Sequence, residues 1–93
     1  MNKRKYRQMA RWFHILSHPA RLQILDELLE ENRCVCDLQT ALRKPQPYIS
    51  QQLRVLRACG MVECCKKSQF RFYCLSDPAV KQVLRLARNR QDR

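Results

Sequence analysis

The sequence predicts a single domain, residues 1–93, that is mainly α-helical and carries one small β-hairpin. Three observations lead to this prediction. Apolar residues recur at helical spacing through most of the chain, in stretches that prolines separate. Two short segments between residues 61 and 75 are instead rich in β-branched and aromatic residues, as strands are. The chain has 93 residues, 45% of them hydrophobic, which is enough for one modest core.

Two helices are expected before residue 32. In residues 3–17 apolar side chains recur at i, i+3, i+7 and i+10 from Tyr6, and the stripe is wider than one small core needs. Pro19 interrupts this helix, because proline lacks an amide hydrogen and disfavours helix in the residue before it. Proline also suits the first turn of a helix, so a second helix is expected from Pro19 to about Glu31.

A tight break separates the next two helices. Asp37 is a good N-cap, which predicts a short helix over residues 38–42. The sequence RKPQP then forms the break, and Pro47 fits the first position of a helix over residues 47–59. Gly60 is the chain's only glycine, and it predicts a left-handed end to this helix.

A hairpin follows this helix. Two strands are expected, with the sequences MVECC and FRFYCL, at residues 61–65 and 70–75. The short cationic connection KKSQ joins them. If Lys66 pairs with Gln69, Cys64 lies opposite Arg71.

A last helix completes the chain. Asp77 and Pro78 are suited to open it, and it is expected over residues 78–89. The predicted order is then α-α-α-α-β-β-α, with a short third helix. A short helix, a tight turn and a longer helix followed by a basic hairpin are typical of a winged helix-turn-helix. The sequence therefore predicts that fold.

An excess of positive charge predicts a polyanionic partner. The chain has 19 Lys and Arg against 8 Asp and Glu, a formal net charge of +11. Neutralising phosphates with basic side chains releases condensed counterions, which favours nucleic acid as the partner. An acidic membrane surface and an acidic protein are the alternatives. No enzyme is expected, because the sequence shows no carboxylate pair, nucleophile–base grouping or phosphate-cradling glycine loop.

The sequence also predicts an intracellular, cytoplasmic protein. It has no run of about 18 apolar residues that could span a membrane. Its N-terminus is basic but has no small-residue cleavage site typical of a signal peptide. In the cytoplasm thiols stay reduced, so the six cysteines are expected to be free, metal-binding or redox-active rather than a disulfide framework.

The expected helix 47–59 has an apolar back and a polar front, which a helix needs to enter the major groove. Its front, which includes Arg57, offers side chains that read base edges or contact phosphates. The candidate DNA-binding residues of this helix and of the hairpin are Gln46, Tyr48, Ser50, Gln51, Gln52, Arg54, Lys66, Lys67 and Arg71. The alternative is an ordinary solvated surface, which the short helix before it, the cationic hairpin and the net charge argue against.

Four stretches of the chain share a further pattern. They are LSHPARLQILDELL (16–29), CVCDLQTAL (34–42), QPYISQQLRVLRACGMV (46–62) and FYCL (72–75). In this order and spacing they resemble the ArsR/SmtB family of bacterial and archaeal metal-sensing repressors. The resemblance implies a homodimeric winged-helix repressor that pairs through its first and last helices. It also implies binding to an imperfect palindrome in double-stranded operator DNA, weakened by an effector.

In that family the sequence C-V-C-D-L carries the thiolate site of members that sense arsenic and soft metals, which makes Cys34 and Cys36 the candidate metal ligands. Residues i and i+2 of an extended segment project to the same side, so both sulfurs could turn onto one ion. Thiolates suit soft ions such as As(III), Cd(II) or Pb(II), and no cofactor is expected to be obligatory. Binding of one ion by both sulfurs would distort the N-cap at Asp37 and tilt the helix-turn-helix.

The chain departs from the family's pattern at three places. Gln39 stands where arsenic sensors often have a third cysteine, the N-terminal arm has no cysteine, and the last helix lacks the histidine and acidic ligands of zinc sensors. A third thiolate would come from Cys59, Cys64, Cys65 or Cys74. Taken singly, each of these four is more often a small packing residue than a ligand. Two other functions stay open: a repressor of the same fold that responds to thiol oxidation or sulfide, and a winged-helix module that binds RNA or a protein and has inert cysteines.

Overall fold

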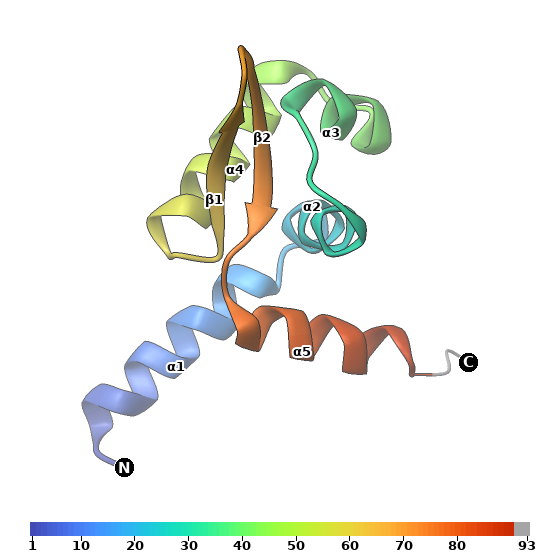
Figure 1. Ribbon diagram of the computed structural model, residues 1–93. Coiled ribbons are helices and arrows are strands. Elements are labelled where there is room, and N and C mark those ends of the chain that lie inside the picture. The colour runs from blue at the N-terminus through green and yellow to red at the C-terminus, as the bar shows by residue number, and fades with distance from the viewer. Residues whose placement is uncertain (91–93) are drawn as a thin grey trace.

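The structure, a computed structural model, describes residues 1–90 and confirms the predicted order of elements (Figure 1). The elements are α1 (Lys3–Leu16), α2 (Pro19–Glu30), α3 (Val35–Leu42), α4 (Gln46–Ala58), β1 (Val62–Lys67), β2 (Phe70–Leu75) and α5 (Pro78–Arg88). The two strands form one antiparallel hairpin. This is the architecture of a winged helix-turn-helix, in which the hairpin β1–β2 is the wing.

One hydrophobic core joins the four later helices and the hairpin. Its largest fully buried side chains are Ile24, Leu25, Leu38, Ile49, Leu53, Leu56, Met61 and Val80. In Figure 1, α2 lies in the middle of the domain, and it contacts α3, α4, α5 and β2. Three of the buried residues belong to α4 at the predicted spacing, so the opposite face of α4 is left to solvent. Within residues 1–90, no helix combines the length and apolarity needed to cross a membrane.

Helix α1 is attached to this core near its C-terminal end. Its buried residues are Ile15 and Leu16, whereas residues 1–11 are exposed. The indole N–H of Trp12 donates to Asp77 Oδ2 at 3.1 Å, which links α1 to the start of α5. Figure 1 shows α1 and α5 together on the side of the domain away from α3 and the hairpin tip. In the single chain, Tyr6, Met9 and Phe13 of the apolar stripe predicted on α1 therefore face solvent, whereas its last member, Leu16, is in the core.

The start of α3 differs from the prediction. Asp37 is not the N-cap: α3 begins at Val35, and Cys34 is the N-cap. The Cys34 side chain accepts from the backbone N–H of Asp37, while the Asp37 carboxylate accepts from the backbone N–H of Cys34 at 3.3 Å. This reciprocal pair is a capping box. Two backbone hydrogen bonds between Arg33 and Tyr73 of β2 hold the chain just before the helix, which explains the earlier start.

The hairpin also has a different register from the predicted one. Its strands extend to Lys67 and Phe70, which pair with each other and leave a two-residue turn. Ser68, the first residue of that turn, has φ of 60°, a positive value typical of two-residue hairpin turns. The pairing is shifted by two residues from the predicted one, so Cys64 lies opposite Tyr73.

The end of α4 confirms the role predicted for Gly60. Its φ is 75°, in the left-handed region, and the N–H of Met61 donates to the carbonyl of Leu56 at 3.0 Å. Pro47 lies at the second position of α4 rather than the first, because the helix begins at Gln46. The ends of the other predicted helices agree with the structure within one residue, apart from the start of α3.

Candidate nucleic-acid interface and thiol clusters

Helix α4 is fixed by its buried face and presents the opposite face to solvent. Leu53 is 1% exposed and anchors the middle of the helix in the core. Gln51 and Arg54, both predicted to bind DNA, are exposed. These two side-chain types can hydrogen-bond to the edges of adenine and guanine. Helix α3 packs against α4 and supports it across the intervening turn. The geometry is that of a helix held ready for the major groove.

The N-terminal end of α4 carries three more of the predicted residues. The side-chain amide of Gln46 donates to the hydroxyl of Ser50 at 2.5 Å. Tyr48 is half-buried against the core, with Lys44 Nζ 5.2 Å from the centroid of its ring. Free backbone N–H groups at a helix N-terminus attract anions. This end of α4 therefore suits a phosphate of a nucleic-acid backbone.

Gln52 lies differently from the other predicted residues of α4. Its side-chain oxygen accepts from Arg21 Nε of α2 at 2.9 Å, and the residue is half-buried. Bidentate recognition of adenine uses both the oxygen and the nitrogen of a glutamine side chain. Gln52 would have to release Arg21 to read a base in that way, whereas Gln51 has its side chain exposed.

The three basic residues predicted on the wing are exposed but divide between its two faces. Side chains alternate along a strand, and Lys66 lies opposite Arg71, so both belong to the face of Tyr73. Lys67 belongs to the other face. The structure therefore groups Lys66 and Arg71 with the side of the wing that packs on the domain.

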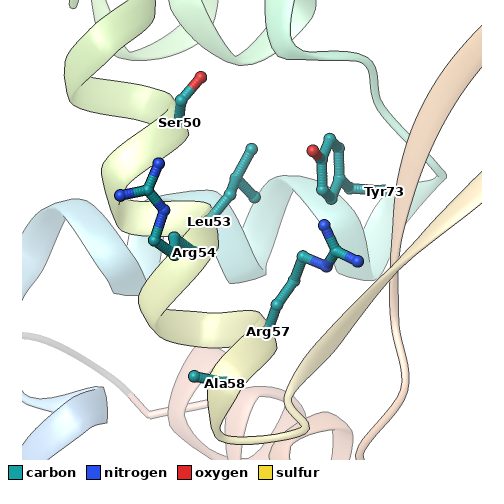
Figure 2. A pocket seen from close by; sticks show the side chains of 6 residues that line it. All are labelled: Ser50, Leu53, Arg54, Arg57, Ala58 and Tyr73. Atoms are coloured by element: carbon teal, nitrogen blue, oxygen red, sulfur yellow. The ribbon is translucent and has the colours of Figure 1, made fainter.

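An open groove of about 470 Å³ lies between α4 and the wing (Figure 2). It is lined by Ser50, Leu53, Arg54, Arg57, Ala58 and Tyr73. Figure 2 shows the side chains of Arg57 and Tyr73 on facing sides of the groove, with Arg54 and Ser50 further along α4. Two guanidinium groups beside two hydroxyl groups can bind phosphate oxygens.

Arg57 and Tyr73 were not among the candidate DNA-binding residues, although Arg57 was placed on the polar front of the helix. Arg57 follows Arg54 by three residues, so helical spacing alone places both on one face. That spacing was a sufficient signal for Arg57. The position of Tyr73 depends on the strand register, which has no comparable signal in the sequence.

The two paired cysteines do not both lie in an extended segment, which corrects that prediction. Cys34 is the N-cap of α3 and half-buried, whereas Cys36 is the second residue of the helix and exposed. Side chains two residues apart on a helix do not face each other. A single ion bound by both sulfurs would therefore require the first turn of α3 to open.

The remaining four cysteines differ in their surroundings. Cys59 is exposed at the C-cap of α4, and Cys64 packs against the core. Cys65 and Cys74 lie on the outer face of the wing, with their Sγ atoms 2.8 Å apart. Glu63 joins them, since its Oε1 lies 3.7 Å from Cys74 Sγ. The ligand atoms of these three residues all lie within 4.8 Å of one another.

The Cys74 thiol is strongly affected by these neighbours. Burial raises its pKa to about 12, and the hydrogen bond with Cys65 and the negative charges of Cys65 and Glu63 act in the same direction. Cys74 is therefore protonated at neutral pH in the metal-free protein, and a thiol is a weaker nucleophile than a thiolate.

Comparison with known proteins places the chain in a family. The profile of the bacterial regulatory proteins of the arsR family matches residues 18–63. A helix-turn-helix-type transcriptional regulator of Methanocaldococcus jannaschii is 40% identical over 84 residues, which cover 88% of this chain and 93% of the relative. A transcriptional repressor SmtB homolog of Synechocystis is 35% identical over 78 residues, covering 84% of this chain and 59% of the relative.

A solved structure agrees with both matches. The homodimeric winged helix-turn-helix DNA-binding domain of a possible ArsR-family regulator from Mycobacterium bovis superposes with a TM-score of 0.80. It is 28% identical in sequence, and the match covers 95% of this chain and 84% of that chain. These matches, together with the fold, show a regulator and not an enzyme. The chain belongs to the ArsR/SmtB family of winged helix-turn-helix transcriptional regulators, which bind DNA.

Proposed function

We propose that the protein is a homodimeric repressor that binds a palindromic operator and is released from it by a thiol-binding metal or metalloid. The observation that carries the DNA part is the exposed polar face of α4 beside a groove lined by two arginines. Because its target is chromosomal DNA, the protein acts in the cytoplasm. The SmtB homolog of Synechocystis, a repressor by name, supports the direction of the regulation.

The proposed DNA contacts follow from the position of each side chain. Gln51 and Arg54 enter the major groove and read base edges, with Gln52 joining them if it releases Arg21. The other predicted residues contact phosphates and fix the orientation of α4 and the wing on the duplex. They are Gln46, Tyr48, Ser50, Lys66, Lys67 and Arg71.

The proposed dimer forms through α1 and α5. On α1, Tyr6, Met9 and Phe13 are 57%, 43% and 51% exposed, and on α5 Leu86 is 70% exposed. Exposed apolar residues gathered on one side of a small domain mark an interaction surface. The winged helix-turn-helix domain from Mycobacterium bovis is homodimeric, which supports a second copy of this chain as the partner. Two-fold pairing also matches the symmetry of a palindromic operator.

Replacing Phe13 with glutamate is expected to shift the protein from dimer to monomer. The substitution places a charge in a surface that would otherwise be desolvated, and an unpaired buried charge is costly. Sedimentation velocity at several protein concentrations measures the shift. Phe70→Glu is the matched control, because Phe70 is 58% exposed at the wing tip, away from α1 and α5, and its replacement should leave the dimer intact. A dimer that survives Phe13→Glu at the same concentrations contradicts this interface.

The proposed inducer is As(III), Cd(II) or Pb(II), bound through Cys34 and Cys36. Its binding would draw the Cys34 sulfur away from the backbone N–H of Asp37, which that sulfur caps. Loss of an oxygen N-cap costs about 0.5–2 kcal/mol, and loss of a sulfur cap should cost about the lower end of this range, because sulfur is a weak acceptor. This cost would loosen the first turn of α3. Since α3 packs against α4, this change would reach the DNA-reading helix. A third thiolate completes the site for As(III), and no obligatory cofactor is proposed.

Gel-shift titration on the DNA upstream of the protein's own operon tests the inducer proposal. With excess reductant present, one of the three ions should release the DNA from the unmodified protein. The Cys34→Ser/Cys36→Ser variant should bind DNA equally well and no longer respond. The Cys59→Ser variant, which keeps both of these cysteines, should still respond, fully if Cys59 is not the third thiolate and only in part if it is. A full response of the double variant excludes these two cysteines. Release by an oxidant alone, reversed by dithiothreitol, would instead support a redox-responsive repressor.

A further inference from the structure

The outer face of the wing carries a group of ligand atoms that neither DNA binding nor the α3 thiols use. Glu63 lies directly opposite Cys74, and Cys65 follows Glu63 by two residues on the same strand. Alternation along the strands puts all three side chains on one face. They come from two strands of the wing, whose backbone hydrogen bonds fix their spacing. The pairing of the two strands therefore holds these three residues next to one another.

One distance in this group already fits two ligands of one metal ion, and a second needs a small adjustment. Cys74 Sγ lies 3.7 Å from Glu63 Oε1 and 2.8 Å from Cys65 Sγ. In a tetrahedral zinc site with Zn–S of about 2.3 Å and Zn–O of about 2.1 Å, neighbouring ligand atoms are separated by roughly 3.5–3.8 Å. The oxygen–sulfur pair already has that separation, and the two sulfurs reach it by a side-chain shift of about 1 Å.

A disulfide fits the same group less well. In the observed register Cys65 lies opposite Phe72, so the two cysteines are diagonal and not directly opposite. Diagonal positions of an antiparallel pair are about 7–8 Å apart at Cα, beyond the usual range of about 4.4–6.8 Å for a disulfide. A disulfide would also leave the Glu63 carboxylate without a role, whereas an ion takes it as a ligand.

We propose that Glu63, Cys65 and Cys74 bind a thiophilic divalent cation, Zn²⁺ or Cd²⁺, on the outer face of the wing. Two thiolates select such ions over Mg²⁺ and Ca²⁺, and a carboxylate is an accepted third ligand. The site and its ion would carry one excess negative charge, which Lys67 on the same face of the wing and the net positive charge of the chain offset. Water can reach the group to supply a fourth ligand, since Glu63 is exposed. The proposal goes beyond the proposed function, which assigns the inducer to α3, and it does not depend on it.

Cadmium titration of the reduced full-length protein without DNA tests the proposal. Binding is followed by the ultraviolet thiolate-to-cadmium charge-transfer band, in competition with a chelator of known affinity. The Cys34→Ser/Cys36→Ser variant should retain a tight site with this band. Adding Cys65→Ser and Cys74→Ser to it should abolish that site. Both variants should show the circular dichroism spectrum of the unmodified protein.

Glu63→Gln, made in the Cys34→Ser/Cys36→Ser background, keeps all wing thiols and changes an exposed side chain. It should weaken cadmium binding at least about tenfold, since loss of even an outer partner of a metal ligand costs about that much. Equal cadmium affinity with and without the wing cysteines would overturn the proposal. So would a Cys65–Cys74 disulfide in protein purified under reductant, found by mass spectrometry together with no cadmium uptake. Because DNA is absent, the result is separate from the outcome of the inducer test.

Discussion

Replacing Arg54 and Arg57 together by alanine is expected to weaken operator binding by roughly 2–6 kcal/mol, about 1–3 kcal/mol for each arginine removed. Both side chains line the groove between α4 and the wing, where in the proposed complex they would contact base edges or phosphates of the duplex. If both bind phosphates, the slope of log K against log salt concentration should also fall by about 2. Fluorescence anisotropy with a labelled operator, repeated at several salt concentrations, measures both effects.

The control for this variant removes the same charge elsewhere. Arg4→Ala/Arg7→Ala takes two arginines from the exposed first half of α1, which Figure 1 places away from α4 and the wing. It lowers the net charge equally, so once sedimentation velocity shows that the variant is still a dimer, any weakening of binding measures the general attraction of the protein to DNA. That weakening should be small beside the effect of the two groove substitutions. Equal effects of the two variants would contradict the assignment of α4 and the wing as the DNA-binding surface.

Replacing Leu53 with alanine is expected to lower the free energy of unfolding by about 2–5 kcal/mol. Leu53 is 1% exposed and lies between Ile49 and Leu56 on the buried face of α4, so the substitution leaves a cavity beneath the DNA-reading helix. The total free energy of unfolding of a small domain is about 5–15 kcal/mol, so the substitution would remove much of the stability. Urea unfolding followed by circular dichroism measures the change.

Leu22→Ala is the matched control for this substitution. Leu22 also lies in a helix, α2, but is 38% exposed, so less apolar surface returns to water. Its replacement should cost clearly less than that of Leu53. If the two variants unfold at the same urea concentration with the same slope, α4 is not anchored through Leu53 as the structure indicates.

The sequence was sufficient to predict most of the fold because apolar spacing sets which helix faces are buried. The stripe Ile49, Leu53 and Leu56 and the glycine at 60 located α4 within one residue. The start of α3 could not be predicted in the same way. Asp37 is the better N-cap by residue type, but the backbone pairing of Arg33 with Tyr73 holds the chain so that the helix begins at Val35. A tertiary contact overrides a local preference there.

The predicted hairpin register was wrong because the sequence has no local signal for its turn. A two-residue turn is signalled in a sequence by Gly or Asn, and here the first turn residue is Ser68, which adopts φ of 60° without that signal. The two-residue shift decides the wing site. In the predicted register Cys65 would lie opposite Phe70, four residues from Cys74, whereas in the observed register the two sulfurs meet.

The position of the exposed face of α4, which we propose binds DNA, was predictable, whereas the contacts of its individual residues were not. Its position followed from the buried side of α4, which leaves Gln51 and Arg54 exposed. The hydrogen bond from Arg21 to Gln52 joins residues 31 positions apart, and no local pattern indicates it. The proposed binding of one ion by Cys34 and Cys36 stays a prediction. Cys36 lies in a helix and not in an extended segment, so the two sulfurs do not project to the same side, but they could still bind one ion after the first turn of α3 opens.

The central claim is that α4 and the wing read an operator sequence. A competition binding experiment tests this claim most directly. The labelled duplex upstream of the protein's own operon is bound at moderate salt and then competed with the same duplex or with a shuffled duplex of equal length and composition. A sequence-reading repressor should prefer its own duplex by about 10³-fold or more. Equal competition by both duplexes, or no binding at moderate salt, would contradict the claim.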